Sequence, residues 1–277
     1  MTPTGVAPHR ADGDAVPVLL WHAVDDLDDD DTFRVRPADF ARHLDLVVES
    51  GRVPLTATRY AHLLRTGGTL PPRAVLLTFD DGYRGWPDHV VPALAARDLT
   101  ATFFVTTGTL GGDGWMTPEQ VRELAAGGDR WEVGAHSVTH PHLDVLPATR
   151  AAEEIAGSRQ RLEDLTGGPV RSFAYPHGSN SRRTRRLVAQ AGYETAHAVK
   201  NALSHPRDDV LAVARWTVRS DTPDEQVRAV LAGTGAPRSW RRERLRTWGY
   251  RQVRRGAAAR AARRAGTPSG AQAAVRS

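Results

Sequence analysis

From position 76 the chain reads Leu76-Leu77-Thr78-Phe79-Asp80-Asp81-Gly82-Tyr83, and this stretch indicates both the class of fold and the place of its chemistry. Its first half is an apolar, β-prone run typical of a buried strand, which stops abruptly at two carboxylates and a glycine. Adjacent ionised carboxylates repel each other and burial increases that cost, so a cation or a proton must relieve it. The pair therefore predicts either a metal site at a strand end or a simple Asp-Asp-Gly turn.

A second group of candidate ligands lies in residues 131–140, which read Trp-Glu-Val-Gly-Ala-His-Ser-Val-Thr-His. His136 and His140 can bind one ion, and neutral imidazole is a common ligand of zinc and its neighbours. A zinc-protease helix would carry a Glu directly after the first His, where Ser137 stands instead, so we expect both histidines on a turn after a strand. One Asp and two His leave a position open for water, which is typical of hydrolytic metal sites.

Four motifs follow one another along the chain: Thr-Phe-Asp-Asp-Gly-Tyr at 78–83, Ala-Thr-Phe-Phe-Val at 101–105, a Gly-Ala-His-Ser motif with a second His-Pro at 134–143, and Phe-Ala-Tyr-Pro-His-Gly at 173–178. Their order resembles the NodB-type polysaccharide deacetylases, carbohydrate esterase family 4, over residues 17–232. The resemblance implies a distorted (β/α) barrel and a divalent metal, zinc or another first-row transition metal.

The resemblance also assigns different roles to the two aspartates, which the chemistry of the residues alone does not do. It implies that Asp80 is the catalytic base and that the metal ligands are Asp81, His136 and His140.

The general acid is expected from the first strand. The chain has no Leu-x-His motif after Val210, where many relatives carry a catalytic histidine. A subgroup with rearranged motifs, resembling the poly-N-acetylglucosamine deacetylases, has an aromatic-His pair on that strand, and Trp21-His22 is similar to it. His22 is then the acid that protonates the leaving amine, which suits a group that titrates near neutrality. The alternative is a histidine that only ends a strand.

The third motif differs from the commoner family form, in which an arginine orients the base. Ala174 holds that place, and Arg215 in the next apolar segment is our candidate replacement. The resemblance further implies that the backbone N–H of His177 helps to hold the oxyanion, with Gly178 permitting a close approach. Relatives usually have Tyr at this position, so the His177 side chain is either a substrate contact or a plain loop residue.

These expectations describe a metal-dependent hydrolase that removes N-acetyl groups from a sugar or polysaccharide, with Asp80 taking a proton from water and His22 protonating the departing nitrogen. Two alternatives stay open. Enzymes of a similar fold open cyclic amides or remove formyl groups with the same kind of metal. A basic binding protein on an inactive scaffold would be expected to lose its ligands, but all of them are present in this sequence.

The composition fits one catalytic domain. The chain has 277 residues with 40% hydrophobic content, enough for one sizeable core, and no cysteine for disulfides or thiolate metal sites. Residues 1–15 lack the features of a signal peptide, and no run approaches the ~18 apolar residues of a membrane span. We therefore expect a cytoplasmic or peripheral membrane location, and secretion only if the start site is misassigned.

Strand and helix patterns alternate, which favours a parallel sheet or barrel with the chemistry at the carboxyl ends of its strands. Helices are predicted at 38–50, 121–126 and 224–231, where Pro37, a Thr117-to-Gln120 capping box with Pro118, and Thr222-Pro223 give start signals. The predicted strands are Val16 to Trp21, Ala74 to Phe79, Ala101 to Thr106, Trp131 to Gly134, Val170 to Tyr175, Thr195 to Val199 and Leu211 to Val218.

The expected organisation is a flexible tail at 1–15, a deacetylase-like domain at 16–232 and an Arg-rich tail at 233–277. Residues 238–277 contain twelve Arg and one Glu, so the basic charge of the chain belongs to this tail. Its arginines alternate with Trp and Leu, which predicts either disorder or binding to an anionic membrane surface; nucleic acid is the weakest of the three readings. Membrane binding would make a lipid-linked N-acylated sugar an attractive substrate. The acidic run at 25–31 is expected to be a solvated loop rather than a calcium site.

Overall fold

A computed structural model describes residues 15–27 and 30–239. Its main sheet has the order β10-β1-β5-β6-β7-β8-β9, with every neighbouring pair parallel, while β4 pairs with β5 and β2 pairs with β3. The strands are β1 (Val18–Trp21), β2 (Ala23–Val24), β3 (Arg34–Val35), β4 (Val53–Pro54), β5 (Ala74–Asp81), β6 (Ala101–Val105), β7 (Trp131–Ala135), β8 (Ser172–Ala174), β9 (Thr195–His197) and β10 (Trp216–Thr217).

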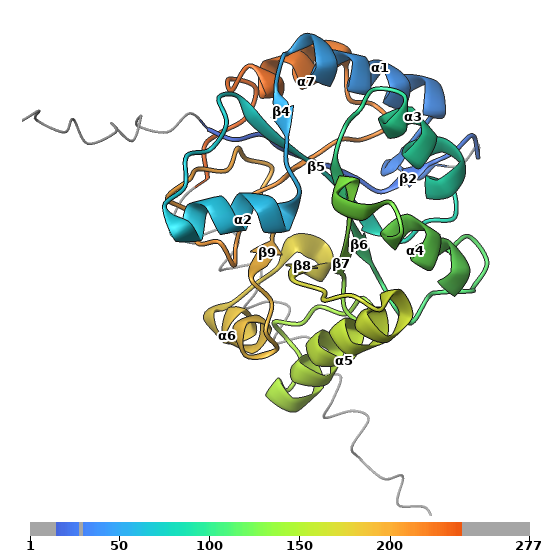
Figure 1. The fold of residues 1–277 in the computed structure, drawn as a ribbon, viewed down its shortest axis with the longest axis vertical. Coiled ribbons are helices and arrows are strands. Elements are labelled where there is room, and N and C mark those ends of the chain that lie inside the picture. The colour runs from blue at the N-terminus through green and yellow to red at the C-terminus, as the bar shows by residue number, and fades with distance from the viewer. Residues whose placement is uncertain (1–14, 28–29, 240–277) are drawn as a thin grey trace, which may run out of the picture. The chain divides into compact units, whose positions relative to one another are not determined.

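Helices connect these strands and surround the sheet (Figure 1). They are α1 (Pro37–Glu49), α2 (Ala57–Thr66), α3 (Val91–Ala95), α4 (Pro118–Ala125), α5 (Ala148–Thr166), α6 (Arg182–Gln190) and α7 (Asp224–Leu231). The predicted start of α1 at Pro37 is confirmed, and the capping box between Thr117 and Gln120 forms both of its hydrogen bonds. Parallel strands need such crossover connections, so the alternation in the sequence is the cause of the topology.

The prediction of an α/β fold with a distorted (β/α) barrel is confirmed, because the parallel strands curl into a partial barrel with helices outside it (Figure 1). The last predicted strand is wrong over most of its length: β10 holds only Trp216 and Thr217. The carbonyl oxygens of Leu211 and Ala212 instead accept hydrogen bonds from the Tyr175 hydroxyl and the Lys200 ammonium, both at 2.9 Å. Val213 still pairs with β9, as an isolated parallel bridge to His197, so the segment follows that strand without forming a continuous strand of its own.

An aromatic cluster fills the space between β5 and the helices. Phe79 stacks on Trp21 and Phe103, with ring centroids 5.5 and 5.0 Å apart, and all three side chains are buried. Each such side chain contributes about 1.5–3 kcal/mol by burial. Because successive residues of a strand face opposite sides, Thr78 and Asp80 must face into the barrel.

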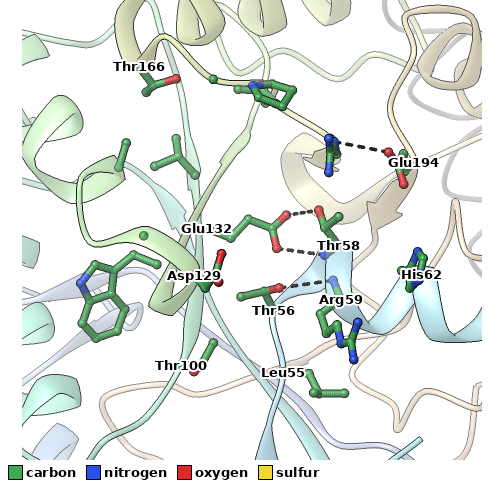
Figure 2. Close-up of a pocket in the computed structure, with 18 of the residues that line it drawn as sticks. Leu55, Thr56, Thr58, Arg59, His62, Thr100, Asp129, Glu132, Thr166 and Glu194 are labelled. Carbon is green, nitrogen blue, oxygen red and sulfur yellow. Dashed lines mark hydrogen bonds and ion pairs between the residues drawn. The ribbon is translucent and has the colours of Figure 1, made fainter. Parts of the chain in front are cut away.

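A cleft of about 980 Å³ lies at the amino ends of the strands, beside α2 (Figure 2). The Glu132 carboxylate accepts hydrogen bonds from the Thr58 backbone N–H and hydroxyl, at 2.9 and 2.6 Å, and so helps to cap α2. Glu194 pairs with Arg65 and Arg171. The acids at this end of the barrel thus hold structural elements together, while Asp80 and Asp81 lie at the opposite ends of the strands.

The two expected tails fall largely outside the described residues, which begin at Ala15 and end at Ser239. The last described residue is tied to the domain, because the Ser239 N–H donates to the Leu203 carbonyl at 2.8 Å. Membrane binding by the Arg-rich segment stays a prediction. Among the residues that the structure describes, no helix combines the length and apolar character needed to cross a bilayer.

Candidate active site

Asp80 and Asp81 end strand β5 at a sharp turn. Asp81 and Gly82 both have positive φ, 87° and 100°, and the Asp81 carbonyl accepts a hydrogen bond from the Thr106 N–H at 3.1 Å. A non-glycine residue in this region of backbone space costs about 1–3 kcal/mol, so the surrounding structure must hold it there. The turn lets both carboxylates approach one histidine, His136, whereas adjacent residues of a regular strand would point apart.

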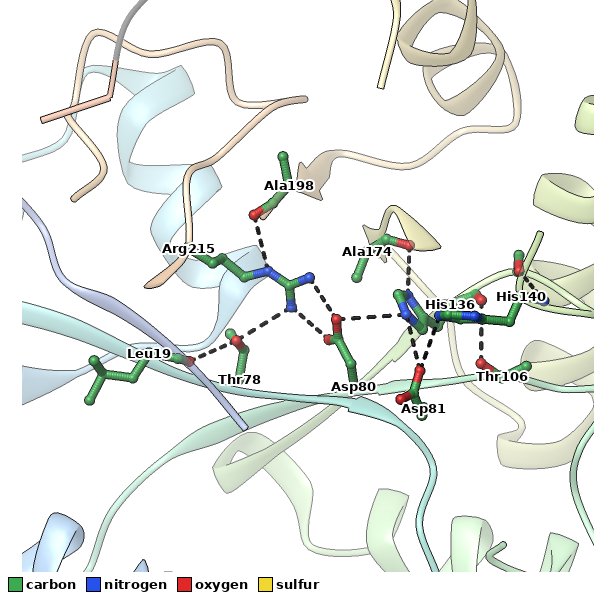
Figure 3. A network of polar contacts seen from close by, with 11 residues as sticks. Leu19, Thr78, Asp80, Asp81, Thr106, His136, His140, Ala174, Ala198 and Arg215 are labelled. Atoms are coloured by element: carbon green, nitrogen blue, oxygen red, sulfur yellow. Dashed lines mark hydrogen bonds and ion pairs between the residues drawn. The ribbon is translucent and has the colours of Figure 1, made fainter. Parts of the chain in front are cut away.

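A buried arginine binds Asp80 from the other side (Figure 3). The Arg215 guanidinium donates to both carboxylate oxygens of Asp80, at 2.6 and 2.7 Å, and its Nε donates to the Ala198 carbonyl at 3.3 Å. Arg215 is 0% exposed and Asp80 is 2% exposed. Burial alone would raise the pKa of Asp80, but Arg215 and His136 outweigh it and hold this pKa below its ordinary value. Asp80 is therefore ionised at neutral pH.

His136 lies on the turn that follows β7, where its backbone N–H donates to the Val105 carbonyl at 2.9 Å. Its Nδ1 lies 2.9 Å from the Ala174 carbonyl, so Nδ1 carries the proton and Nε2 faces the acids. Nε2 is 3.3 Å from Asp81 Oδ1 and 3.6 Å from Asp80 Oδ2. Burial lowers the pKa of His136, but the two carboxylates outweigh it and the net shift is upward.

Asp81, His136 and His140 form a compact group of donors, with one ligand atom from each lying within 4.8 Å of the others. His140 Nε2 is 3.3 Å from Asp81 Oδ1. Burial and the neighbouring His136 lower the pKa of His140, which favours the neutral imidazole that metals require. Two imidazoles and one carboxylate fit a divalent first-row metal with a position left open. The three residues that the sequence proposes as ligands are thus brought together.

Glu154 on α5 supports the turn that carries the two histidines, although it is not among the residues predicted for the site. Its carboxylate accepts hydrogen bonds from the backbone N–H groups of Val138 and Thr139, at 2.9 and 2.8 Å, and from the Thr139 hydroxyl at 2.7 Å. Ser137 and His140 have positive φ, and the His140 N–H donates to the Ser137 hydroxyl at 3.0 Å. A charged acceptor that satisfies three donors fixes the spacing of His136 and His140.

His22 lies between β1 and β2, at the same end of the barrel. Its backbone carbonyl accepts a hydrogen bond from Trp86 Nε1 at 2.9 Å. Burial lowers the pKa of the His22 imidazole, while the charges of Asp81 and Asp80 oppose that shift. The net shift is downward, and the general-acid role of His22 stays a prediction.

His177 lies in a short 3-10 turn at Pro176–Gly178 with φ at 57°. Its ring is 4.5 Å from that of His140 and 3.8 Å from that of His142, between centroids. Partial burial and these two histidines lower the pKa of His177 to about 4. Gly178 leaves no room for a side chain, since its φ is 67° and a Cβ there would lie 2.3 Å from the Val199 backbone nitrogen.

Comparisons with known proteins agree with this geometry. The family model described as polysaccharide deacetylase matches residues 67–196. The chain is 25% identical over 179 residues to a putative polysaccharide deacetylase, YxkH, of Bacillus subtilis, covering 65% of this chain and 62% of that protein. It is 36% identical over 86 residues to the poly-beta-1,6-N-acetyl-D-glucosamine N-deacetylase of Escherichia coli, covering 31% of this chain and 13% of that protein. The chain thus spans less than two thirds of the length of these relatives.

Two solved structures share the fold. IcaB from Ammonifex degensii superposes with a TM-score of 0.70 at 27% identity, covering 80% of this chain and 97% of that one. The Streptococcus pyogenes deacetylase PplD, in complex with acetate, gives a TM-score of 0.72 at 22% identity, covering 80% of this chain and 99% of that one. The similarity in fold therefore extends over 80% of this chain.

Proposed function

Because the chain carries a domain of the polysaccharide deacetylase family, we propose that it is a metal-dependent hydrolase that removes N-acetyl groups from an N-acetylated glycan. The likeness to the Escherichia coli enzyme and to IcaB supports a polymer of N-acetylglucosamine as the substrate class. The observation that carries the proposal is the position of Asp80, an ionised carboxylate held by Arg215 directly beside the group of Asp81, His136 and His140.

The three donors would hold a divalent metal, which supplies Lewis acidity toward a water molecule and the acetamide carbonyl. Asp80 accepts the proton of the attacking water. It can do so at neutral pH because the bidentate contact with Arg215 keeps it ionised and fixes the plane of its carboxylate. Asp81 stays a ligand, and the two neighbouring acids therefore have separate roles.

The remaining steps belong to His22 and His177. His22, which interacts electrostatically with both acids, protonates the departing nitrogen, so that acetate and a free amine are produced. The backbone N–H of His177 donates to the oxyanion of the tetrahedral intermediate, as the resemblance of residues 173–178 to the family motif implies. The Gly178 N–H donates to the Tyr175 carbonyl at 2.7 Å, which closes the turn that carries this N–H.

The direct test is release of acetate from N-acetylglucosamine oligomers by the zinc-loaded protein, measured together with the free amine that appears. Equal amounts of acetate and amine are expected. N-formyl sugars and cyclic amides serve as competing substrates, and a preference for either of them over N-acetyl sugars would contradict the proposal.

Metal binding should be visible without any assay of activity. At a zinc concentration of about 100 times Kd, the stabilisation is about 2.7 kcal/mol, or roughly 5–10 °C in Tm. We expect this increase in a thermal melt of the wild-type protein, its reversal by a chelator, and its loss in Asp81→Asn. The matched control is Asp129→Asn, an exposed aspartate at the opposite end of the barrel, which should keep the increase. A full increase in Asp81→Asn would rule out Asp81 as a ligand.

A further inference from the structure

Phe33 differs from the other phenylalanines of the chain. It is 38% exposed, whereas the other five, Phe40, Phe79, Phe103, Phe104 and Phe173, are fully buried. It lies on a turn between the acidic run and strand β3. Its ring lies outside the buried core and makes its contacts with two polar side chains.

The ring of Phe33 packs against the imidazole of His22. Their centroids are 4.9 Å apart with the planes tilted by 54°. The guanidinium carbon of Arg219 lies 5.3 Å from the centroid of the same Phe33 ring. Phe33 is thus held between a cation on the chain after β10 and the residue that we assign as general acid.

The pairing of β2 with β3 puts these two rings side by side. Ala23 is the register partner of Arg34 in a parallel pair, and His22 and Phe33 directly precede them. The turn itself is fixed, because the Phe33 N–H donates to Asp31 Oδ1 at 2.9 Å. The contact between the rings therefore follows from backbone register and does not depend on a chance rotamer.

His22 has little else to orient its ring. Its Nδ1 atom is buried, and no hydrogen-bond partner for it is present among the residues that the structure describes. A histidine that acts as an acid or base is commonly held by a hydrogen bond to the ring nitrogen that does not react. At His22 the ring contact with Phe33 takes that place.

We propose that Phe33 is a positioning residue, which holds the His22 imidazole in the orientation needed to protonate the leaving nitrogen. This inference rests on the proposed function. Rotation of the imidazole would move the acidic N–H away from the leaving group while leaving Asp80 and the metal ligands in place. Loss of Phe33 should therefore slow the departure of a leaving group that needs a proton, and should leave the attack of water nearly unchanged.

The test compares Phe33→Ala with wild type on an N-acetylglucosamine oligomer and on p-nitrophenyl acetate. The amine of the first must be protonated to leave, whereas p-nitrophenolate leaves without a proton. We expect kcat on the amide to fall roughly 10-fold to 100-fold with KM little changed, because misplacement of a catalytic group has effects of this size. Hydrolysis of the ester should stay within about twofold of wild type, as for a surface substitution.

Two further variants are needed. Phe33→Tyr retains the ring and should restore kcat on the amide. Val53→Ala removes an apolar side chain of similar exposure, 41%, from β4 at the amino ends of the strands, and should change neither reaction. Equal losses on amide and ester, or a rise in KM alone, would overturn the positioning role and indicate disturbed folding or a substrate contact.

A second measurement does not depend on activity. The ring protons of His22 should show a ring-current shift in the NMR spectrum of the wild-type protein, and this shift should disappear in Phe33→Ala and persist in Phe33→Tyr. Unchanged His22 signals in Phe33→Ala would overturn the inference. If the wild-type protein hydrolysed neither substrate, the proposed function would fail, and the NMR comparison would still decide whether the rings of Phe33 and His22 are in contact.

Discussion

Replacing Asp80 with asparagine should lower kcat for acetate release by about 100-fold to 10,000-fold, the usual contribution of a general base. Asparagine has nearly the same shape as aspartate but cannot accept the proton of the attacking water. Zinc binding should persist, because the three residues that we assign as ligands are unchanged. Acetate release and the zinc-dependent increase in Tm, measured on the same preparation, separate a defect in proton transfer from loss of the metal.

The Asp80→Asn protein is expected to be less stable than wild type, since the substitution leaves the buried Arg215 without its anionic partner. Activity is therefore compared at a temperature where circular dichroism shows both proteins to be folded. Asp129→Asn again serves as the control and should retain wild-type kcat. Wild-type turnover by folded Asp80→Asn would show that Asp80 is not the base.

Local signals in the sequence were enough to predict most of the fold. The apolar run before Asp80 forms β5, and the capping box at Thr117 starts α4. The features that the sequence does not predict arise from contacts between segments far apart in the chain. The two-residue pair β2 and β3 has no recognisable sequence pattern, although it places Phe33 beside His22. The segment at 211–215 has the apolar character of a strand, but only Val213 pairs with β9, and the carbonyls of Leu211 and Ala212 accept side-chain hydrogen bonds.

The candidate site also combines residues that the sequence predicts with contacts that only the tertiary structure reveals. Residue type and spacing predict that His136, His140 and one of the two aspartates form a group. The family resemblance selects Asp81, and the structure places the three donor atoms together. Arg215 was selected only because a cation was needed near the base, and its guanidinium does contact Asp80. Glu154 could have been considered, since a charged residue on the buried face of a helix needs partners. Its actual partners, two backbone N–H groups and the Thr139 hydroxyl in the turn between His136 and His140, depend on tertiary packing.

Removing Arg215 should have the largest effect on stability. Arg215→Met keeps much of the side-chain volume but leaves the Asp80 carboxylate buried without its partner, and breaking a buried ion pair in this way costs about 3–5 kcal/mol. The free energy of unfolding, measured with urea at pH 7, should fall by that amount. Arg185→Met is the matched control: it removes a partly exposed ion pair with Asp209, and such pairs contribute about 1 kcal/mol or less.

The pH dependence of the free energy of unfolding shows whether Arg215 stabilises the protein through the charge of Asp80. Since the pKa of Asp80 is below its ordinary value in the folded protein, its contribution to stability is present above the unfolded pKa of about 4 and is lost as the pH falls through the folded pKa. The difference between wild type and Arg215→Met should therefore narrow on acidification. A difference that stays constant between pH 7 and the acid limit of folding would mean that Arg215 acts through packing instead of charge.

The double variant separates structure from catalysis. With Asp80→Asn added to Arg215→Met, no unpaired charge is left at this position, so much of the lost stability should return, whereas acetate release should stay as low as in Asp80→Asn alone. Additive losses of stability would show that the two residues do not act as a pair. Recovery of stability without recovery of turnover is the expected result, because Arg215 serves the reaction only by keeping Asp80 ionised and in place.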